Sequence, residues 1–234
     1  MTRSVAIITA RGGSKRIPRK NIRDFLGQPI LAYSVGAALA AGCFDEVMVS
    51  TDDEEIARVA LELGAKVPFL RSPQASDDLA STESVLHEVL DEYRRRDELF
   101  DYACCLYPTA PFVTAQKLRS GHLLLLESGA DSVLPVVRFG YPIQRALKIV
   151  DNRLSMIWPE HVDARSQDLK PAYHDCGQFY FFNVARFLET RQLFGERTLP
   201  MEVPESEAQD IDTEEDWKVA EMKFLIWQRQ GAVI

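Results

Sequence analysis

The stretch Ser4-Val-Ala-Ile-Ile-Thr-Ala-Arg-Gly-Gly-Ser-Lys-Arg-Ile-Pro-Arg-Lys-Asn21 decides the fold class. Its first six residues are mostly apolar and rich in β-branched side chains, which predicts a buried first strand. Gly12 and Gly13 follow that strand at once and let the backbone come close to a ligand. Five cations lie within the ten residues 11–20: Arg11, Lys15, Arg16, Arg19 and Lys20. Like charges this close repel unless an anion lies among them, so a polyphosphate at the carboxyl end of the strand is the expected ligand.

A solvated basic loop is the alternative interpretation, because most charge runs are solvated. The position of the glycines directly after a strand, and the rigid Ile17-Pro18 pair among the cations, favour phosphate binding. The loop has neither the Walker spacing nor the Gly-x-Gly-x-x-Gly fingerprint of dinucleotide-binding proteins. The missing fingerprint argues against an oxidoreductase that uses NAD.

The bulk composition predicts one α/β domain that spans residues 1–234. The chain has 46% apolar and 26% charged residues and a formal charge of −8, which argues against nucleic-acid binding. No apolar run reaches the ~20 residues that cross a bilayer, and no signal peptide pattern is found, so we expect a cytoplasmic location without membrane partners. The four cysteines match no zinc spacing and are expected to be reduced: Cys43, Cys104, Cys105 and Cys176.

Alternating strand and helix patterns over residues 4–137 predict right-handed crossovers and a mostly parallel sheet. The expected strands are 4–9, 46–50, 66–70, 101–106 and 131–137, and the expected helices are 29–41, 53–63, 82–96 and 114–126. The alternation of strands and helices stops at 138–171, where the pattern predicts two short strands, 145–150 and 153–158. We interpret this segment as a subunit-contacting arm or a lid over the site. A strand at 177–182, a helix at 184–190 and a helix at 213–228 complete the core.

A second chemical feature, Ala208-Gln-Asp-Ile-Asp212, directly precedes the last helix. Alternate residues of an extended segment point to one side, so Asp210 and Asp212 present two carboxylates together while Ile211 turns into the core. Two such carboxylates repel unless a cation lies between them, and Mg²⁺ binds through one or two carboxylates plus phosphate oxygens. The alternative is that they only begin the helix, where acidic side chains are favourable. Beside a basic phosphate loop, the pair favours Mg²⁺ and a phosphoryl or nucleotidyl transfer reaction.

These motifs, taken together and in order, resemble the CMP-sialic acid synthetase family of acid-sugar cytidylyltransferases. The matching stretches are Ala10-Arg-Gly-Gly-Ser-Lys15, Lys20-Asn21, Ser50-Thr-Asp52, Pro108-Thr-Ala-Pro111, Gly177 and Gln209-Asp-Ile-Asp212. Other stretches are most similar to the branch of this family that acts on pseudaminic acid: Phe69-Leu-Arg-Ser72, Tyr107-Pro-Thr-Ala-Pro-Phe-Val113, Tyr141-Pro-Ile-Gln-Arg-Ala146, Arg165-Ser-Gln-Asp168 and Pro171-Ala-Tyr-His-Asp175. The resemblance implies a Rossmann-like nucleotide-diphospho-sugar transferase fold, a homodimer, and Mg²⁺-assisted attack of the anomeric hydroxyl of a nonulosonic acid sugar on the α-phosphate of CTP.

The resemblance also assigns roles by motif position. The expected nucleotide-binding residues are Arg11, Gly12, Gly13, Ser14, Lys15, Lys20, Asn21, Arg71 and Thr82, of which Asn21 and Arg71 read the cytosine and Thr82 lies close to it. Asp210 and Asp212 are the expected Mg²⁺ ligands. The residues expected to act in catalysis are Arg11, Lys15, Lys20 and Asp212.

The sugar side departs from the sialic acid pattern. Tyr107 stands where those enzymes tend to have glutamine, and Phe112-Val113 stands near the place of an arginine, so a less polar sugar pocket is expected. That polarity suits the 6-deoxy end of pseudaminic acid. The expected sugar-binding residues are Tyr107, Gln178, His174 and Arg165, the last for the sugar carboxylate, with Arg145 as its alternative. The same reaction on N-acetylneuraminic, legionaminic or another acid sugar is the nearest alternative, and a non-catalytic nucleotide-binding regulator is a more distant one.

Overall fold

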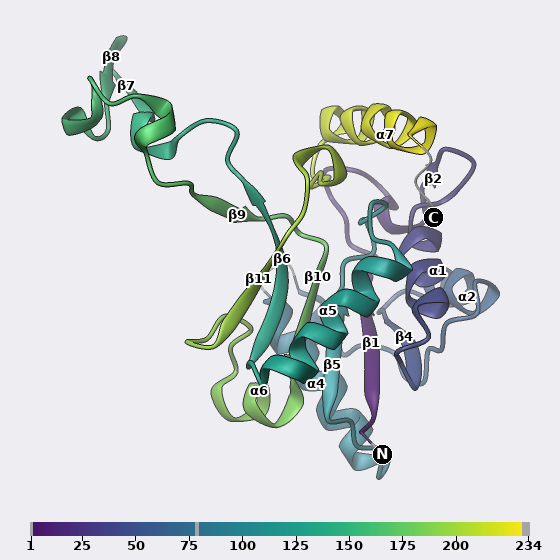
Figure 1. Cartoon of the computed structure of the whole chain (residues 1–234). Helices are drawn as coiled ribbons and strands as arrows, with labels where there is room; N and C mark the ends of the chain where they lie inside the picture. Colours follow the sequence, from purple (N-terminus) through teal and green to yellow (C-terminus); the bar gives the residue numbers. More distant parts are fainter. Residues whose placement is uncertain (1, 78–79, 231–234) are drawn as a thin grey trace.

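The computed structural model describes residues 2–77 and 80–230. Over these residues, seven strands form the central sheet in the order β11-β6-β10-β5-β1-β4, with β9 added beside β6 (Figure 1). The strand bounds are β1 Ser4–Thr9, β4 Glu46–Ser50, β5 Tyr102–Leu106, β6 Ser132–Arg138, β9 Tyr173–Asp175, β10 Phe179–Asn183 and β11 Thr198–Glu202. The mostly parallel sheet is confirmed: β1 pairs parallel with β4 and β5, β6 pairs parallel with β11, and β10 and β9 are antiparallel.

Helices cover both faces of this sheet. On one face, α1 (Leu31–Ala41), α2 (Glu54–Glu62) and α5 (Ala115–Ser128) pack on alternate residues of β1 such as Ala6 and Ile8. On the other face, α4 (Thr82–Arg95) packs against β1, α6 (Val184–Thr190) packs against β10, and their apolar residues share one buried cluster with Val5 and Ile7. The strand is therefore apolar on both sides, as its unbroken apolar run predicts.

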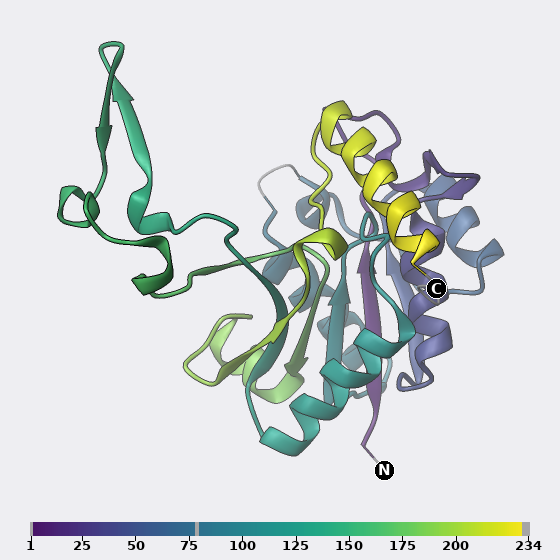
Figure 2. The ribbon, with the colours of Figure 1, turned by 45° about the horizontal axis from the view of Figure 1, so that its top comes forward.

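The last helix, α7 (Glu214–Arg229), closes the end of the molecule at which β1 terminates (Figure 2). It begins with the predicted cap, in which Thr213 and Asp216 exchange hydrogen bonds. Its Phe224 ring packs edge-on against Phe25 and Tyr33, at centroid distances of 5.6 and 5.0 Å. Ile17 and Ile211 belong to the same buried cluster, so the basic loop and the acidic segment share one apolar anchor.

Most expected elements are confirmed within a few residues, but the strand expected at 66–70 is wrong. Lys66 makes only an isolated bridge to Met48, and Pro68 has no N–H to extend the pairing. Several short elements have no counterpart among the expected ones: β2 (Asp24–Phe25), β3 (Gln28–Pro29), α3 (Pro73–Ser76), β9, β11, and the 3-10 turns η1 (Lys20–Ile22), η2 (Ile143–Arg145), η3 (Pro159–His161), η4 (Ser166–Asp168) and η5 (Glu205–Glu207). Elements this short carry no periodic signal.

The excursion at 138–171 extends away from the sheet (Figures 1 and 2). It carries the hairpin of β7 (Leu147–Val150) and β8 (Arg153–Met156), joined by Asp151 and Asn152 in left-handed conformations. Apolar side chains on this hairpin remain in solvent, and Ile149 is 73% exposed. We call residues 138–171 the arm. In the described part of the chain, no helix is long and apolar enough to cross a membrane.

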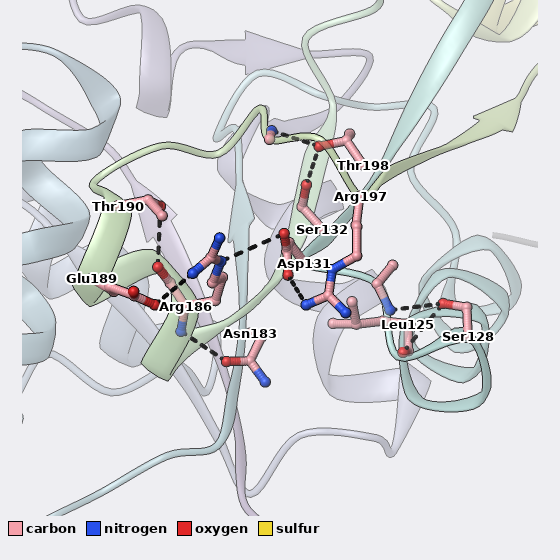
Figure 3. Close-up of polar contacts among 12 residues, drawn as sticks. Leu125, Ser128, Asp131, Ser132, Asn183, Arg186, Glu189, Thr190, Arg197 and Thr198 are labelled. Carbon is pink, nitrogen blue, oxygen red and sulfur yellow. Dashed lines mark hydrogen bonds and ion pairs between the residues drawn. The ribbon is translucent and has the colours of Figure 1, made fainter.

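An ion-pair cluster fixes the far end of the sheet, where β6 begins (Figure 3). Asp131 accepts a hydrogen bond from Arg197, at 2.5 Å, and faces Arg186 of α6 at 3.6 Å. Ser132 and Thr198 meet at 2.9 Å beside it. These contacts tie α6 and β11 to β6 at the end of the sheet where β1 and β5 begin.

The cluster around Phe224 generates a stability prediction. Phe224→Ala is expected to lower the free energy of unfolding by ~3–5 kcal/mol, because a fully buried ring is lost. Leu225→Ala, the next residue on the same helix and 43% exposed, is expected to cost under ~1 kcal/mol. Urea denaturation of both variants measures the difference. Equal losses would contradict the role of this cluster.

Candidate functional site

A cavity of about 560 Å³ opens where β1 and β5 end. This position, at the carboxyl ends of parallel strands, is the usual place for ligands in open α/β sheets. The cavity brings together most of the residues that the sequence singles out: Arg11, Ser14, Lys15, Lys20, Asn21, Arg71, Thr82, Tyr107, Asp210 and Asp212.

The structure separates the cations that the sequence treats alike. Arg11, Lys15 and Lys20 line the cavity, and Arg16 does so while its Nη2 lies 2.8 Å from Asp212 Oδ1. Arg19 points elsewhere and pairs with Asp53 at the start of α2. Four cations of the loop therefore gather at the cavity although the whole chain is acidic, and Arg16 and Lys20 among them face Asp212.

Lys20 connects the basic loop with the acidic segment. Its Nζ donates a hydrogen bond to the carbonyl oxygen of Ile211, at 2.6 Å, and lies 3.5 Å from Asp212 Oδ1. Ile211 itself is fully buried, and Asp210 and Asp212 on either side of it line the cavity. The alternation expected from the sequence is therefore what the structure shows for these three residues.

The two carboxylates differ in their electrostatics. Asp210 has a pKa above its ordinary value, first because the surrounding protein desolvates it and next because Asp212 repels its charge. Lys20 acts in the opposite direction. A cation that reached both carboxylates would offset this penalty.

Buried polar side chains line a different part of the cavity. Arg71 is 7% exposed, and its guanidinium donates from Nη2 to the carbonyl oxygen of Ser50 at 2.6 Å and from Nε to Ser50 Oγ at 3.1 Å. Burial lowers the pKa of Arg71. Asn21 is also buried and donates from Nδ2 to the carbonyl oxygen of Arg11, at 2.8 Å. Groups held this firmly are suited to reading the edge of a base.

Tyr107 borders the cavity at the end of β5. Its hydroxyl lies 3.4 Å from Thr82 Oγ1, and its ring meets that of Tyr180 edge-on at 5.5 Å. The Tyr180 hydroxyl donates to Asp175 Oδ2 at 2.5 Å, and Asp175 Oδ1 accepts from the Gly177 amide at 3.0 Å. A side chain at Gly177 would lie 3.6 Å from the Tyr107 ring and 3.8 Å from Asp210. Glycine there keeps the space between Tyr107 and the carboxylate pair open.

Three expected sugar-binding residues do not line this cavity. Gln178 is 2% exposed and donates from Nε2 to the carbonyl oxygen of Glu207, at 2.6 Å, so its amide is buried and bonds to the backbone at the end of η5. His174 packs on Phe139, with ring centroids 4.7 Å apart. Arg165 lies on the arm, directly before η4, and the alternative Arg145 lies 3.5 Å from Ser166 on the same arm.

The expectation that Phe112 and Val113 make the sugar pocket less polar is wrong. Both are 1% exposed and lie in the core, where the Phe112 ring packs against Phe224 and Trp227. An apolar residue after a strand is as compatible with the core as with a pocket, and the sequence gives no signal to separate the two.

Several lining residues had no predicted role. They come from α3, from the residues that flank the α3–α4 connection, from α4 and from the segment after β5: Ala75, Asp77, Ala80, Val85, Pro108 and Thr109. Thr82 and Val85 are three residues apart, which places them on one face of α4. That spacing could have indicated Val85 once Thr82 was assigned to the site.

The comparisons with known proteins agree with this geometry. The model of a family described as cytidylyltransferase matches residues 5–218. The chain belongs to the cytidylyltransferase family. It is 41% identical over 225 residues to the pseudaminic acid cytidylyltransferase of Campylobacter jejuni, with 96% of this chain and 97% of that protein covered.

Other family members are more distant. The CMP-N,N'-diacetyllegionaminic acid synthase of Legionella pneumophila is 34% identical over 229 residues, with 94% and 95% of the two chains covered. Among solved structures, a CMP:2-keto-3-deoxy-manno-octonic acid synthetase complexed with CTP superposes with a TM-score of 0.69 at 17% identity, and covers 97% of this chain and 100% of its own. This likeness confirms the expected Rossmann-like nucleotidyltransferase fold.

The glycine pair gives a testable prediction. A Cβ at residue 12 would lie 2.8 Å from Asp53 Oδ2 and 2.9 Å from Asp53 Cβ, whereas one at residue 13 meets nothing within 4 Å. Gly12→Ala is therefore expected to cost ~1–3 kcal/mol of stability by overpacking. Gly13→Ala is expected to leave the free energy of unfolding within ~0.5 kcal/mol.

Thermal unfolding of the two variants measures this difference, and calorimetric titration with CTP supplies a second readout. If Gly13→Ala is stable but loses CTP binding, the phosphates approach the backbone there. A Gly12→Ala protein as stable as the wild type would contradict the close contact with Asp53.

Proposed function

We propose that this enzyme makes CMP-pseudaminic acid and pyrophosphate from CTP and pseudaminic acid. One observation carries the proposal: a single cavity brings a basic loop from the end of β1 against the Asp210–Asp212 pair. The anomeric hydroxyl of the sugar attacks the α-phosphorus and releases its proton to water, the bond between the α-phosphorus and the α–β bridging oxygen breaks, and pyrophosphate leaves with that oxygen. The relatives named as pseudaminic acid cytidylyltransferases, at 40–41% identity over 96% of this chain, support the choice of sugar.

The cavity suggests how the residues divide the work. Arg11, Ser14, Lys15 and Lys20, with the amides of Gly12 and Gly13, hold the triphosphate and neutralise the leaving pyrophosphate. Asn21 and Arg71 bind the cytosine, with Thr82 beside it. Little covalent chemistry is asked of these side chains, so positioning and charge stabilisation dominate the rate.

The residues at the acidic end fit a magnesium ion. In the described residues, no three His, Cys, Asp or Glu side chains gather as a protein-only metal cage. Two carboxylates facing a phosphate-binding loop are nevertheless the donor set that Mg²⁺ uses when substrate phosphates and waters complete its shell. Asp210 and Asp212 would hold the ion, which would neutralise phosphate charge and acidify the sugar hydroxyl. Lys20, at 3.5 Å from Asp212, keeps that carboxylate oriented toward the cavity.

The sugar is proposed to lie between Tyr107 and the carboxylate pair, where Gly177 leaves room. Arg165 and His174 remain proposed sugar contacts, but they can reach the cavity only if the arm moves or a second copy brings its own arm to it. Gln178 is buried and would affect the sugar only indirectly, by fixing the position of the neighbouring Gly177.

We further propose a single-domain homodimer in which the arm contacts the second copy. Exposed apolar side chains on the arm support this: Tyr141 is 84%, Leu154 63% and Val162 59% exposed. A cytoplasmic location belongs to the same proposal. It is supported by the four cysteines, which are all free thiols, three of them buried.

The test is pyrophosphate release with CTP and Mg²⁺ across a panel of pseudaminic, legionaminic, N-acetylneuraminic and 3-deoxy-manno-octulosonic acids. Turnover at least ~100-fold higher with pseudaminic acid is expected, the scale on which an apolar pocket rejects a substrate that carries an extra hydroxyl. Preference for another member would keep the mechanism and discard the sugar. No turnover with any member, with CTP still bound, would favour the nucleotide-binding regulator.

The raised pKa of Asp210 predicts a trade between activity and stability. At neutral pH, burial and the nearby charge of Asp212 both disfavour the ionised form of Asp210 in the folded protein. In the unfolded chain the same carboxyl ionises without this penalty. Asp210→Asn should therefore abolish turnover yet raise Tm slightly at pH 7. The gain should vanish below pH ~3, where the carboxyl is protonated in both states.

Asp212→Asn is the matched control, because it loses the ion pairs with Arg16 and Lys20 and should gain no stability while also losing turnover. Thermal melts from pH 3 to 8 and calorimetric CTP binding compare the two variants. Near-normal turnover in either variant would remove it from the metal site.

A further inference from the structure

Arg19 adopts a backbone conformation that its side chain disfavours. Its φ is 56° and its ψ 27°, in the left-handed region, directly after Pro18 and directly before Lys20. Residues other than glycine persist in this region only where the surroundings hold them, and such residues gather at functional sites.

The guanidinium of Arg19 is held by the first turn of α2. Nη1 donates to Asp53 Oδ2 at 2.5 Å, and Nη2 donates to Asp53 Oδ1 at 3.0 Å and to Glu55 Oε2 at 2.5 Å. This bidentate pairing with Asp53 fixes the orientation of the guanidinium as well as its distance from the carboxylate. Asp53 is fixed in turn, because its Oδ1 caps α2 by accepting from the amides of Glu55 and Ile56, each at 3.0 Å. The hydrogen bond from Arg19 holds the pKa of Asp53 down, at about 2.

The same segment also contacts the other end of the basic loop. The Gly12 amide donates to Asp52 Oδ1 at 2.9 Å, and Gly12 lies so close to Asp53 that a Cβ would clash with its carboxylate. Asp52 and Asp53 therefore touch the loop where it leaves β1 and again where it enters η1. Neither Arg19 nor Asp53 is among the residues that line the cavity.

The turn at Arg19 aims the next residue. Lys20 begins η1, and its Nζ reaches the carbonyl oxygen of Ile211 beside the carboxylate pair. We propose that Arg19 and Asp53 are positioning residues, a clamp that presets residues 11–20 for the triphosphate and directs Lys20 at the cavity. The inference rests on the proposed function, because it assumes that this loop binds CTP. Presetting the loop removes the cost of ordering it when the nucleotide arrives, so the clamp should act on CTP affinity.

Two substitutions isolate the clamp from the fold. Asp53→Asn keeps the cap of α2, since asparagine caps as well as aspartate, but removes the charge that Arg19 needs. Arg19→Gly removes the guanidinium but keeps the turn, since glycine adopts a positive φ readily. Each variant is expected to bind CTP about tenfold more weakly by calorimetry without sugar, and the double variant no more weakly than either single one. The KM for the acid sugar should change less than twofold. Tm should fall in both variants, because the pairing that lowers the pKa of Asp53 also stabilises the fold, so CTP affinity is measured well below Tm, where each variant is folded.

Glu214→Gln is the matched control. It breaks another ion pair of the same region, Arg23 to Glu214 at 2.6 Å, and should leave CTP affinity unchanged. Millimolar guanidinium chloride should restore CTP binding to Arg19→Gly, by placing a guanidinium between Asp53 and Glu55, and should not restore it to Asp53→Asn. Sodium chloride at the same ionic strength should have no such effect.

The outcomes separate the two proposals. A wild-type protein that binds no CTP would overturn the proposed function. If the wild type binds CTP and both variants bind it equally well, the clamp is refuted. A loss of CTP binding in Arg19→Gly that guanidinium does not reverse would also refute it, because the pair would then only stabilise the fold.

Discussion

The hydrogen bond from Lys20 Nζ to the carbonyl oxygen of Ile211, 2.6 Å long, joins segments 191 residues apart. One segment supplies four of the cations that line the cavity, and the other supplies Asp210 and Asp212. A charged donor on a backbone carbonyl fixes the position of that backbone, and the same Nζ lies 3.5 Å from Asp212 Oδ1. Asp210 and Asp212 remain directed at the cavity, and the cationic and anionic halves of the site keep their spacing.

This polar contact depends on an apolar one. Ile17 from the basic loop and Ile211 from the acidic segment lie in the buried cluster that α7 covers. Both are fully buried, each between neighbours that face solvent or the cavity. Burial of the two isoleucines fixes which way the adjoining charged side chains point. The loop and the acidic pair are thus oriented by the hydrophobic effect and only then adjusted by charge.

The fold could be predicted where one periodicity dominates. The apolar run of β1 and the alternation that buries Ile211 both appear in the structure as their patterns indicate. Prediction failed where a residue could serve two environments equally well. Phe112 follows β5 as a pocket residue would, yet its ring packs under α7, because its aromatic partners Phe224 and Trp227 come from chain more than a hundred residues away. Local pattern holds no information about such a partner.

The cations of the basic loop also show that local sequence does not identify the distant partner of a side chain. In sequence, Arg19 and Lys20 are neighbours of equal charge, and the cluster of five cations predicts the same phosphate-binding role for both. The structure sends Arg19 to Asp53 and Lys20 to Ile211, because a left-handed turn at Arg19 swings the two side chains apart. The presence of cations in a loop is therefore readable from sequence, whereas their division between ligand and scaffold depends on a backbone angle and on a carboxylate 34 residues away. A basic loop after a strand thus predicts that an anion binds, and only the tertiary contacts of each cation determine which ones it meets.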